Sequence, residues 1–526
     1  MEAVLMMQRA LAAAQAPARC GEAAPAGHGQ PGGGVVRLGG VQRLAGGAVR
    51  ARLVGPARAH LSVEPGRGDS DSGEGVVGEE EAAAAAAARL FVGLPNNVVS
   101  DGREVNRPQA VSAALRALRL LGVDGVELPV SWAIVQPGSG DCFQWAGYLA
   151  AAGMVHNAGL HLRVSLHTDG AALPDWVADA AAADPDILFT DRSGTRREGC
   201  LSFAVDELPV LIGKTPLQAY EAFFRSFADA FQDFLGSTVT EVTVSLGPNG
   251  ELRYPSYSPG STGGDGYAGV GEFQCYDKYM LARLKRHGEA TGHPMWALSG
   301  PHDAPRYIDS PESAAFFRES SGSCKTDYGR FFLSWYAGEL LAHGDRVLAA
   351  ASGVFAGKSV VLSAKVPLLL RGSRPAEATA GLAGGYGAVA QMFARHACTV
   401  IASGVEAAGE ALLARVKDTC AVHGARLAAE TAPLAVARDG AGAGGTATLA
   451  GMLATDRTRP CQLTYQRMGT RFFSPGHWPL FVQFVRAVEW AEETDGDDLL
   501  AAGDGGSTLT APHASPNSNS TEAHTR

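Results

Sequence analysis

The sequence predicts an α/β protein that folds as a (β/α)8 barrel of the TIM type, with long loops at the C-terminal ends of its strands. Two observations support this prediction. Eight short runs with apolar residues, several of them β-branched, occur between residues 91 and 468, and longer stretches whose apolar residues recur at intervals of three and four lie between them. The chain has 526 residues, of which 46% are hydrophobic, and this is enough for one large barrel with a buried core.

Each expected strand is a short run with apolar residues that a parallel sheet would bury. In chain order they are FVGLP (91–95), GVELPV (125–130), LHLRVSLH (160–167), VTEVTVSLG (239–247), VVLSAKV (360–366), CTVIAS (398–403), RLAAE (426–430) and LTYQRM (463–468). Helical patterns such as AVSAALRALRLLG and PLQAYEAFFRSFADAFQDFLG separate them. In the second pattern, four phenylalanines recur at helical spacing, which favours core packing over a sugar-binding platform.

Segments outside the barrel differ from it in composition. Residues 1–60 carry seven Arg, no Lys and only two acidic residues, so we expect a plastid transit peptide there, although the segment lacks the Ser residues usual in one. The alternative is a disordered leader that does not target the protein to any compartment. Residues 61–88 are acidic, Gly-rich and then polyalanine, which indicates a linker. The barrel is expected over 89–495, and residues 496–526 form a polar tail that we expect to be disordered.

Composition also narrows the classes of partner. The formal net charge of −10 argues against nucleic acid and anionic membranes as partners, and no apolar run reaches the length of a membrane span. The eight cysteines form no CxxC pair, so no metal site is expected. Residues 264–269 match GxGxxG, but no strand leads into them and no helix pattern follows, so no nucleotide cofactor is expected.

In a (β/α)8 barrel, catalytic groups lie at the carboxyl ends of the strands. Glu251 follows the fourth expected strand, and the same rule nominates His167, Lys365, Ser403, Glu430 and Arg467. Two carboxylates at this end of a barrel indicate glycoside hydrolysis, in which one protonates the leaving oxygen and the other activates water or attacks. The alternative is that Glu251 and Glu430 only form ion pairs with Arg253 and Arg426.

The motif LGPNGELRYPSYSPG, followed by PGSTGGDGYAGVGEFQCYDKYM, closely resembles the signature region of the plant β-amylases, which are inverting exo-acting glucan hydrolases. GVDGVELPVSW, LFTDRSGTRREGCLSFAVDELPVLIGKTPLQAY and TYQRM extend the resemblance along nearly the whole body. The resemblance implies that Glu251 is the general acid and Glu430 the general base. It also implies substrate contacts at His167, Lys365, Ser403, Thr431, Ala432 and Arg467.

Three departures from the family pattern affect how a sugar would be held. HTDGAALPDWV is shorter than the family's lid segment, Pro129 stands where the family has a sugar-binding Asp, and PLLLRGS replaces an aromatic wall after Lys365. General acid and base are effective only on a well-placed substrate. We therefore expect the catalytically degenerate, plastid branch of the family, with starch or another α-glucan and a second protein of starch metabolism as partners. The alternative is an active enzyme that releases maltose.

Overall fold

The computed structural model describes residues 88–138, 140–170, 172–257, 269–368, 374–408, 410–431, 461–469 and 471–486. All of them belong to one compact unit of the chain. The transit peptide predicted over 1–60, nearly all of the linker predicted over 61–88 and the tail predicted over 496–526 lie outside the described residues. Ala432, a predicted substrate contact, also lies outside them.

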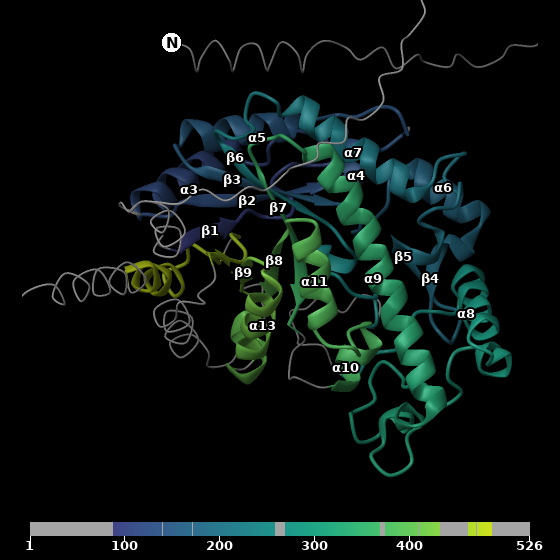
Figure 1. The fold of residues 1–526 in the computed structure, drawn as a ribbon. Coiled ribbons are helices and arrows are strands. Elements are labelled where there is room, and N and C mark those ends of the chain that lie inside the picture. The colour runs from purple at the N-terminus through teal and green to yellow at the C-terminus, as the bar shows by residue number, and fades with distance from the viewer. Residues whose placement is uncertain are drawn as a thin grey trace, which may run out of the picture. The chain divides into compact units, whose positions relative to one another are not determined.

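Eight parallel strands close into a barrel in the spatial order β1-β10-β9-β8-β7-β6-β3-β2 (Figure 1). They are β1 (Arg89–Gly93), β2 (Gly125–Ser131), β3 (His161–His167), β6 (Val239–Val244), β7 (Val361–Pro367), β8 (Thr399–Ser403), β9 (Leu427–Glu430) and β10 (Gln462–Tyr465). Each overlaps one of the eight predicted strands, so the barrel is confirmed. Two further strands, β4 (Leu188–Thr190) and β5 (Arg196–Leu201), pair antiparallel outside the barrel and were not predicted.

Helices lie between successive barrel strands from β1 to β9 and pack around them (Figure 1). The α-helices are α3 (Pro108–Leu120), α4 (Trp132–Val135), α5 (Ala146–Asn157), α6 (Asp175–Ala183), α7 (Pro216–Ala230), α8 (Lys278–Ala290), α9 (Asp327–Phe355), α10 (Arg374–Thr379), α11 (Gly387–Arg395), α12 (Val405–Ala408) and α13 (Glu410–His423). Residues 478–486 are also helical. Single 3-10 turns occur at η1 (Pro185–Ile187), η2 (Phe203–Val205), η3 (Pro248–Gly250), η4 (Pro294–Ala297), η5 (Ala315–Phe317) and η6 (Ser323–Lys325).

Local sequence determines where helix α7 begins and which of its residues are buried. The side chain of Thr215 accepts a hydrogen bond from the Gln218 backbone, and the Gln218 side chain accepts one from the Thr215 backbone, which forms a capping box ahead of Pro216. The four phenylalanines of this segment, Phe223, Phe224, Phe227 and Phe231, are fully buried. They pack in the core, as predicted, and offer no face to a sugar.

The interior of the barrel carries a polar layer, because alternate residues of each strand point inward. Glu127 of β2 pairs in register with Arg163 of β3, which pairs in turn with Glu241 of β6. These three side chains and those of Ser363, Lys365 and Thr464 are each at most 3% exposed. Charged groups therefore lie inside strands that are otherwise apolar, and their arrangement positions the site described next.

Candidate active site

The loop after β6 brings Glu251 to the end of the barrel. Gly247 and Gly250 have φ angles of 148° and 78°, which suit glycine. A Cβ on Gly247 would lie 2.6 Å from the Arg253 carbonyl oxygen, and one on Gly250 would lie 3.1 Å from Cε1 of His167. The glycines therefore permit a tight turn that packs against the end of β3. Glu251 then forms a β-bridge with Lys365 of β7.

Both carboxylate oxygens of Glu251 are engaged. Ser403 Oγ donates to Oε1 over 2.8 Å, and Arg253 Nε donates to Oε2 over 2.7 Å. The side chain of Glu251 is 12% exposed, whereas that of Arg253 is 4% exposed. The carboxylate is thus held between a strand end and its own loop, with a small part open to solvent.

Glu430 is the last residue of β9 and is 5% exposed. Lys365 Nζ donates to its Oε1 over 2.8 Å, and Arg163 Nη2 donates to its Oε2 over 3.1 Å. A general base must accept a proton from water, and Lys365 and Arg163 take up one acceptor site on each oxygen of Glu430.

Glu127 joins the same buried ion network. It lies 3.0 Å from Lys365 Nζ and 3.3 Å from Arg163 Nη2, and Ser165 Oγ donates to it over 2.6 Å. Burial alone would raise the pKa of Glu127, but the charges of Lys365, Arg163 and Arg467 and the Ser165 hydrogen bond hold that pKa well below its usual value. Lys365 and Arg163 therefore each contact more than one buried carboxylate inside the barrel.

The two predicted catalytic carboxylates share neighbours. Ser403, which donates to Glu251, is the register partner of Glu430 on the adjacent strand. Lys365 bridges to Glu251 through its backbone and to Glu430 through its ammonium group. The structure therefore gathers Glu251, Glu430, Lys365 and Ser403 at the C-terminal end of β6 to β9.

Comparison with known proteins identifies the family. Residues 91–492 match the sequence model of glycosyl hydrolase family 14. The chain belongs to glycosyl hydrolase family 14. It is 43% identical over 442 residues to a protein named inactive beta-amylase 9 of Arabidopsis thaliana, covering 79% of this chain and 80% of that one. It is 36% identical over 482 residues to chloroplastic beta-amylase 1 of the same plant, covering 84% and 83%.

A solved structure agrees with the fold. The catalytic domain of a beta-amylase from Paenibacillus polymyxa superposes with a TM-score of 0.59 at 22% identity, covering 77% of this chain and 100% of that one. At this identity the likeness supports the barrel, and it carries no argument about the substrate.

The other predicted site residues of this family member lie around the same barrel end. His167 ends β3, and its Nδ1 is 3.8 Å from Asp169 Oδ1. The hydroxyl of Thr431 accepts a hydrogen bond from the Gln466 backbone over 2.9 Å. Arg467 Nη1 donates to the Leu94 carbonyl over 3.3 Å and also to the Asn96 side chain. These contacts are all within the protein.

The sequence offered an ion-pair partner for each of the two carboxylates, and one of the two partners was right. Glu251 pairs with Arg253 as considered. Glu430 pairs with Lys365 and Arg163 instead of Arg426. Arg426 directly precedes β9, so about 13 Å of extended backbone separates its Cα from that of Glu430.

Residues that hold the site were missed. Glu127 and Arg163 lie within segments that were predicted as strands without a role for either side chain. The available signal was a charge at an alternate position of an otherwise apolar strand. Asp169 was missed as well: it accepts hydrogen bonds from the Ser245 hydroxyl and, over 2.7 Å, from the Asn249 backbone, so it braces the turn before Glu251.

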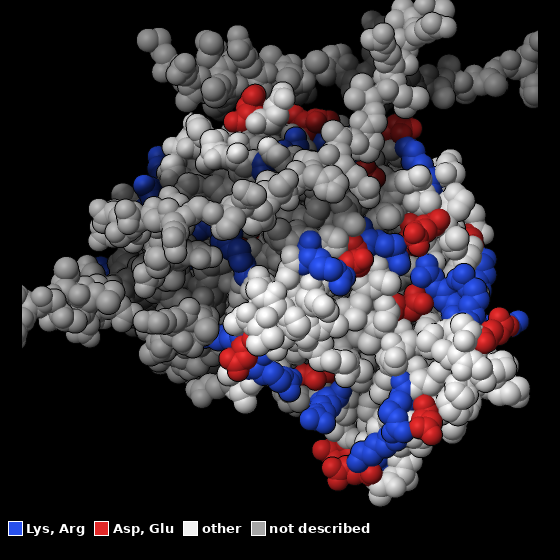
Figure 2. Space-filling model, viewed as in Figure 1, with Lys and Arg blue, Asp and Glu red and all other residues white. Residues whose placement is uncertain are grey.

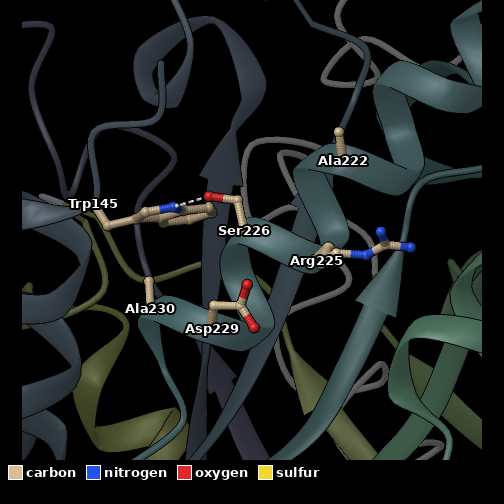
Figure 3. A pocket seen from close by; sticks show the side chains of 6 residues that line it. All are labelled: Trp145, Ala222, Arg225, Ser226, Asp229 and Ala230. Atoms are coloured by element: carbon tan, nitrogen blue, oxygen red, sulfur yellow. Dashed lines mark hydrogen bonds between the residues drawn. The ribbon is translucent and has the colours of Figure 1, made fainter. Parts of the chain in front are cut away.

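Two surface pockets lie away from the predicted site residues. One of about 460 Å³ is on the outer side of α7, where Trp145 Nε1 donates to Ser226 Oγ (Figure 3). None of the predicted site residues lines it. Across the described ranges, no three His, Cys, Asp or Glu side chains come together as a metal site. No helix in the same ranges is long and apolar enough to cross a membrane.

Proposed function

We propose that this family 14 protein acts in plastid starch metabolism as an α-1,4-glucan-directed protein with little or no hydrolytic activity, and that its role is regulatory. One observation carries the proposal: all four oxygens of Glu251 and Glu430 accept hydrogen bonds from protein side chains. Glu430, the general base position, is bound by two buried cations. In catalysis, water and sugar would have to compete with these protein donors for the same carboxylate oxygens.

Two further observations support the same conclusion. The chain is 43% identical to a protein named as an inactive beta-amylase. The sequence also departs from the family pattern in the lid, at Pro129 and after Lys365. Each change removes a group that would orient the sugar, and misplacement by about 1 Å can cost on the order of 10²-fold in rate.

The second candidate is an active enzyme that releases maltose from the non-reducing ends of starch. It is favoured by the presence of both carboxylates and by 36% identity to a protein named chloroplastic beta-amylase 1. If the two carboxylates act, the reaction would invert the anomeric centre, because one would protonate the leaving oxygen while the other activated water.

Maltose release decides between the two candidates. We expect the full-length protein, at saturating soluble starch, to turn over at least about 10²-fold below the slow end of the usual enzyme range of about 1 to 10³ per second. A family member with established activity is the positive control, and the Glu251→Gln variant sets the background. Turnover within the usual range would overturn the proposal. Sedimentation with insoluble starch, measured in parallel, tests whether the protein still binds glucan.

The plastid location rests on the leader and on relatives whose names include the word chloroplastic. We expect residues 1–88 fused to a fluorescent protein to direct it into plastids, because the first 60 residues are Arg-rich and poor in acids. A fusion of residues 61–88 alone is the control and should remain in the cytosol. Cytosolic fluorescence from the longer fusion would contradict the assignment.

A further inference from the structure

The short segment that follows β3 is fastened to strand β5. The backbone N–H of Gly170 donates to the Gly199 carbonyl oxygen over 3.2 Å. A Cβ on Gly199 would overlap the carbonyl oxygen of Gly170, so this close approach of two backbones requires glycine at that position. The family pattern has a longer lid after His167, whereas this chain places a short segment against β5.

Asp169 fastens the same segment to the turn that carries Glu251. The Ser245 hydroxyl donates to its Oδ1, and the Asn249 backbone donates to its Oδ2 over 2.7 Å. The Asp169 side chain is only 10% exposed. Burial raises the pKa of the Cys200 thiol on β5, and the nearby charge of Asp169 adds to that rise. One carboxylate therefore lies between β5 and the turn before Glu251.

The turn needs an outside contact because of its backbone conformation. Asn249 has a φ angle of 61°, in the left-handed region, and it lies between Gly247 and Gly250, whose φ angles are 148° and 78°. Conformations of this kind persist only where the surrounding structure fixes them. Glu251 directly follows Gly250, so the conformation of the turn sets where its carboxylate lies relative to its two hydrogen-bond donors.

We propose that Asp169 is a positioning residue that keeps the Glu251 carboxylate bound by Ser403 and Arg253, so that the segment after β3 braces the predicted general acid. The role of this brace in limiting hydrolysis rests on the proposed function. His167 Nδ1 lies 3.8 Å from Asp169 Oδ1, which is beyond hydrogen-bond distance, so the turn is the stronger partner of Asp169.

Carboxylate labelling measures how firmly Glu251 is held. The full-length protein is treated with a water-soluble carbodiimide and glycine ethyl ester, which convert accessible carboxylates into amides, and mass spectrometry gives the rate at each site. Leucine resembles aspartate in its branching but accepts no hydrogen bond. We therefore expect Asp169→Leu to raise the labelling rate of Glu251 at least about threefold, because two hydrogen bonds to a charged group are lost from its turn.

Exposed carboxylates provide the reference rate within each sample. Figure 2 shows Asp and Glu side chains spread over the described surface, and the side chain of Asp327 is 77% exposed. The Ser245→Ala variant, which removes one of the two hydrogen bonds, repeats the test if leucine disturbs the barrel, and it should give a smaller rise at Glu251. Rates at Glu251 equal to that of the unmodified protein in both variants would overturn the proposal.

The conservative variant separates hydrogen bonding from charge. In Asp169→Asn, the amide oxygen can accept from the Asn249 backbone and the amide nitrogen can donate to the Ser245 hydroxyl. Labelling of Glu251 should therefore stay within about twofold of the unmodified protein, since both contacts are kept. Equal rises in the leucine and asparagine variants would overturn the brace, because its two hydrogen bonds would then have no effect on Glu251.

A second aspartate serves as the matched control. Asp124 accepts from the Leu90 backbone over 2.7 Å at the start of β2, which is the other end of the barrel. Asp124→Ala should leave Glu251 labelling unchanged, and a rise as large as that of Asp169→Leu would overturn the proposal. Labelling does not depend on hydrolysis. Maltose release in the usual enzyme range, together with the labelling expected here, would contradict the proposed function and leave the brace in place.

Discussion

Replacing Arg163 with methionine is expected to lower the free energy of unfolding by about 3–5 kcal/mol. The guanidinium is fully buried and lies 3.3 Å from Glu127, 4.0 Å from Glu241 and 3.1 Å from Glu430. Burial would lower the pKa of Arg163, but the charges of these carboxylates raise it overall, so the cation is strongly held. Its removal leaves buried carboxylates with too few cations, and that penalty exceeds the loss of one surface ion pair.

Urea unfolding of the full-length protein measures this effect. The matched control is Arg330→Met, which removes a pair with Asp327 whose side chains are 67% and 77% exposed, and we expect a change of at most about 1 kcal/mol there. The double variant Arg163→Met/Glu430→Gln should recover part of the loss, because it also removes one unpaired carboxylate. An Arg163→Met protein as stable as the Arg330→Met control would show that the network does not stabilise the barrel.

The Asp277→Asn variant is expected to change how stability depends on pH. Asp277 caps α8: its Oδ1 accepts from the Tyr279 and Met280 backbones, and its Oδ2 accepts from Ser202 Oγ. Burial raises its pKa to about 7, although the hydrogen bonds from Met280, Ser202 and Tyr279 oppose the rise. In the unfolded chain an Asp has a pKa of about 3.9.

The sign of the effect follows from the proton count. Between about pH 4 and pH 7 the folded chain holds this proton and the unfolded chain has lost it, so the free energy of unfolding falls as pH rises through this window. Asparagine caps a helix about as well as aspartate but does not titrate. The variant's stability minus that of the unmodified protein should therefore be larger at pH 8 than at pH 5 by about 2–3 kcal/mol.

Urea unfolding at those two pH values gives the difference. A change in capping strength would alter the variant's free energy of unfolding equally at the two pH values, so it cancels in the comparison. The exposed Asp327→Asn variant serves as a control and should show a pH-dependent difference well below 1 kcal/mol, since its carboxylate is 77% exposed. A flat difference for Asp277→Asn would show that Asp277 is already ionised in the folded protein at pH 5.

Local patterns predicted the barrel because its strands and helices are each marked by nearby residues. VVLSAKV is rich in valine and LHLRVSLH has apolar residues at alternate positions, and each became a strand within one or two residues of the expected ends. The turn before Glu251 also has a local cause, since a glycine on each side of Pro248-Asn249 is typical of a tight turn. The short strands β4 and β5 were missed because three to six residues of mixed character carry no clear period.

The sequence by itself determined the barrel, the family and the placement of Glu251 and Glu430 at the carboxyl ends of two strands, because these depend on short-range patterns and long motifs. Only the tertiary structure decided which cations hold Glu430 and Glu127. Arg163 and Glu430 are 267 residues apart, and Lys365 and Glu127 are 238 apart. Such pairs form only when the barrel closes and brings inward-facing positions of separate strands together. The residues next to each member of such a pair in the sequence do not indicate its partner. For this reason Arg426 could be considered as the partner of Glu430, whereas Lys365 and Arg163 bind it in the structure.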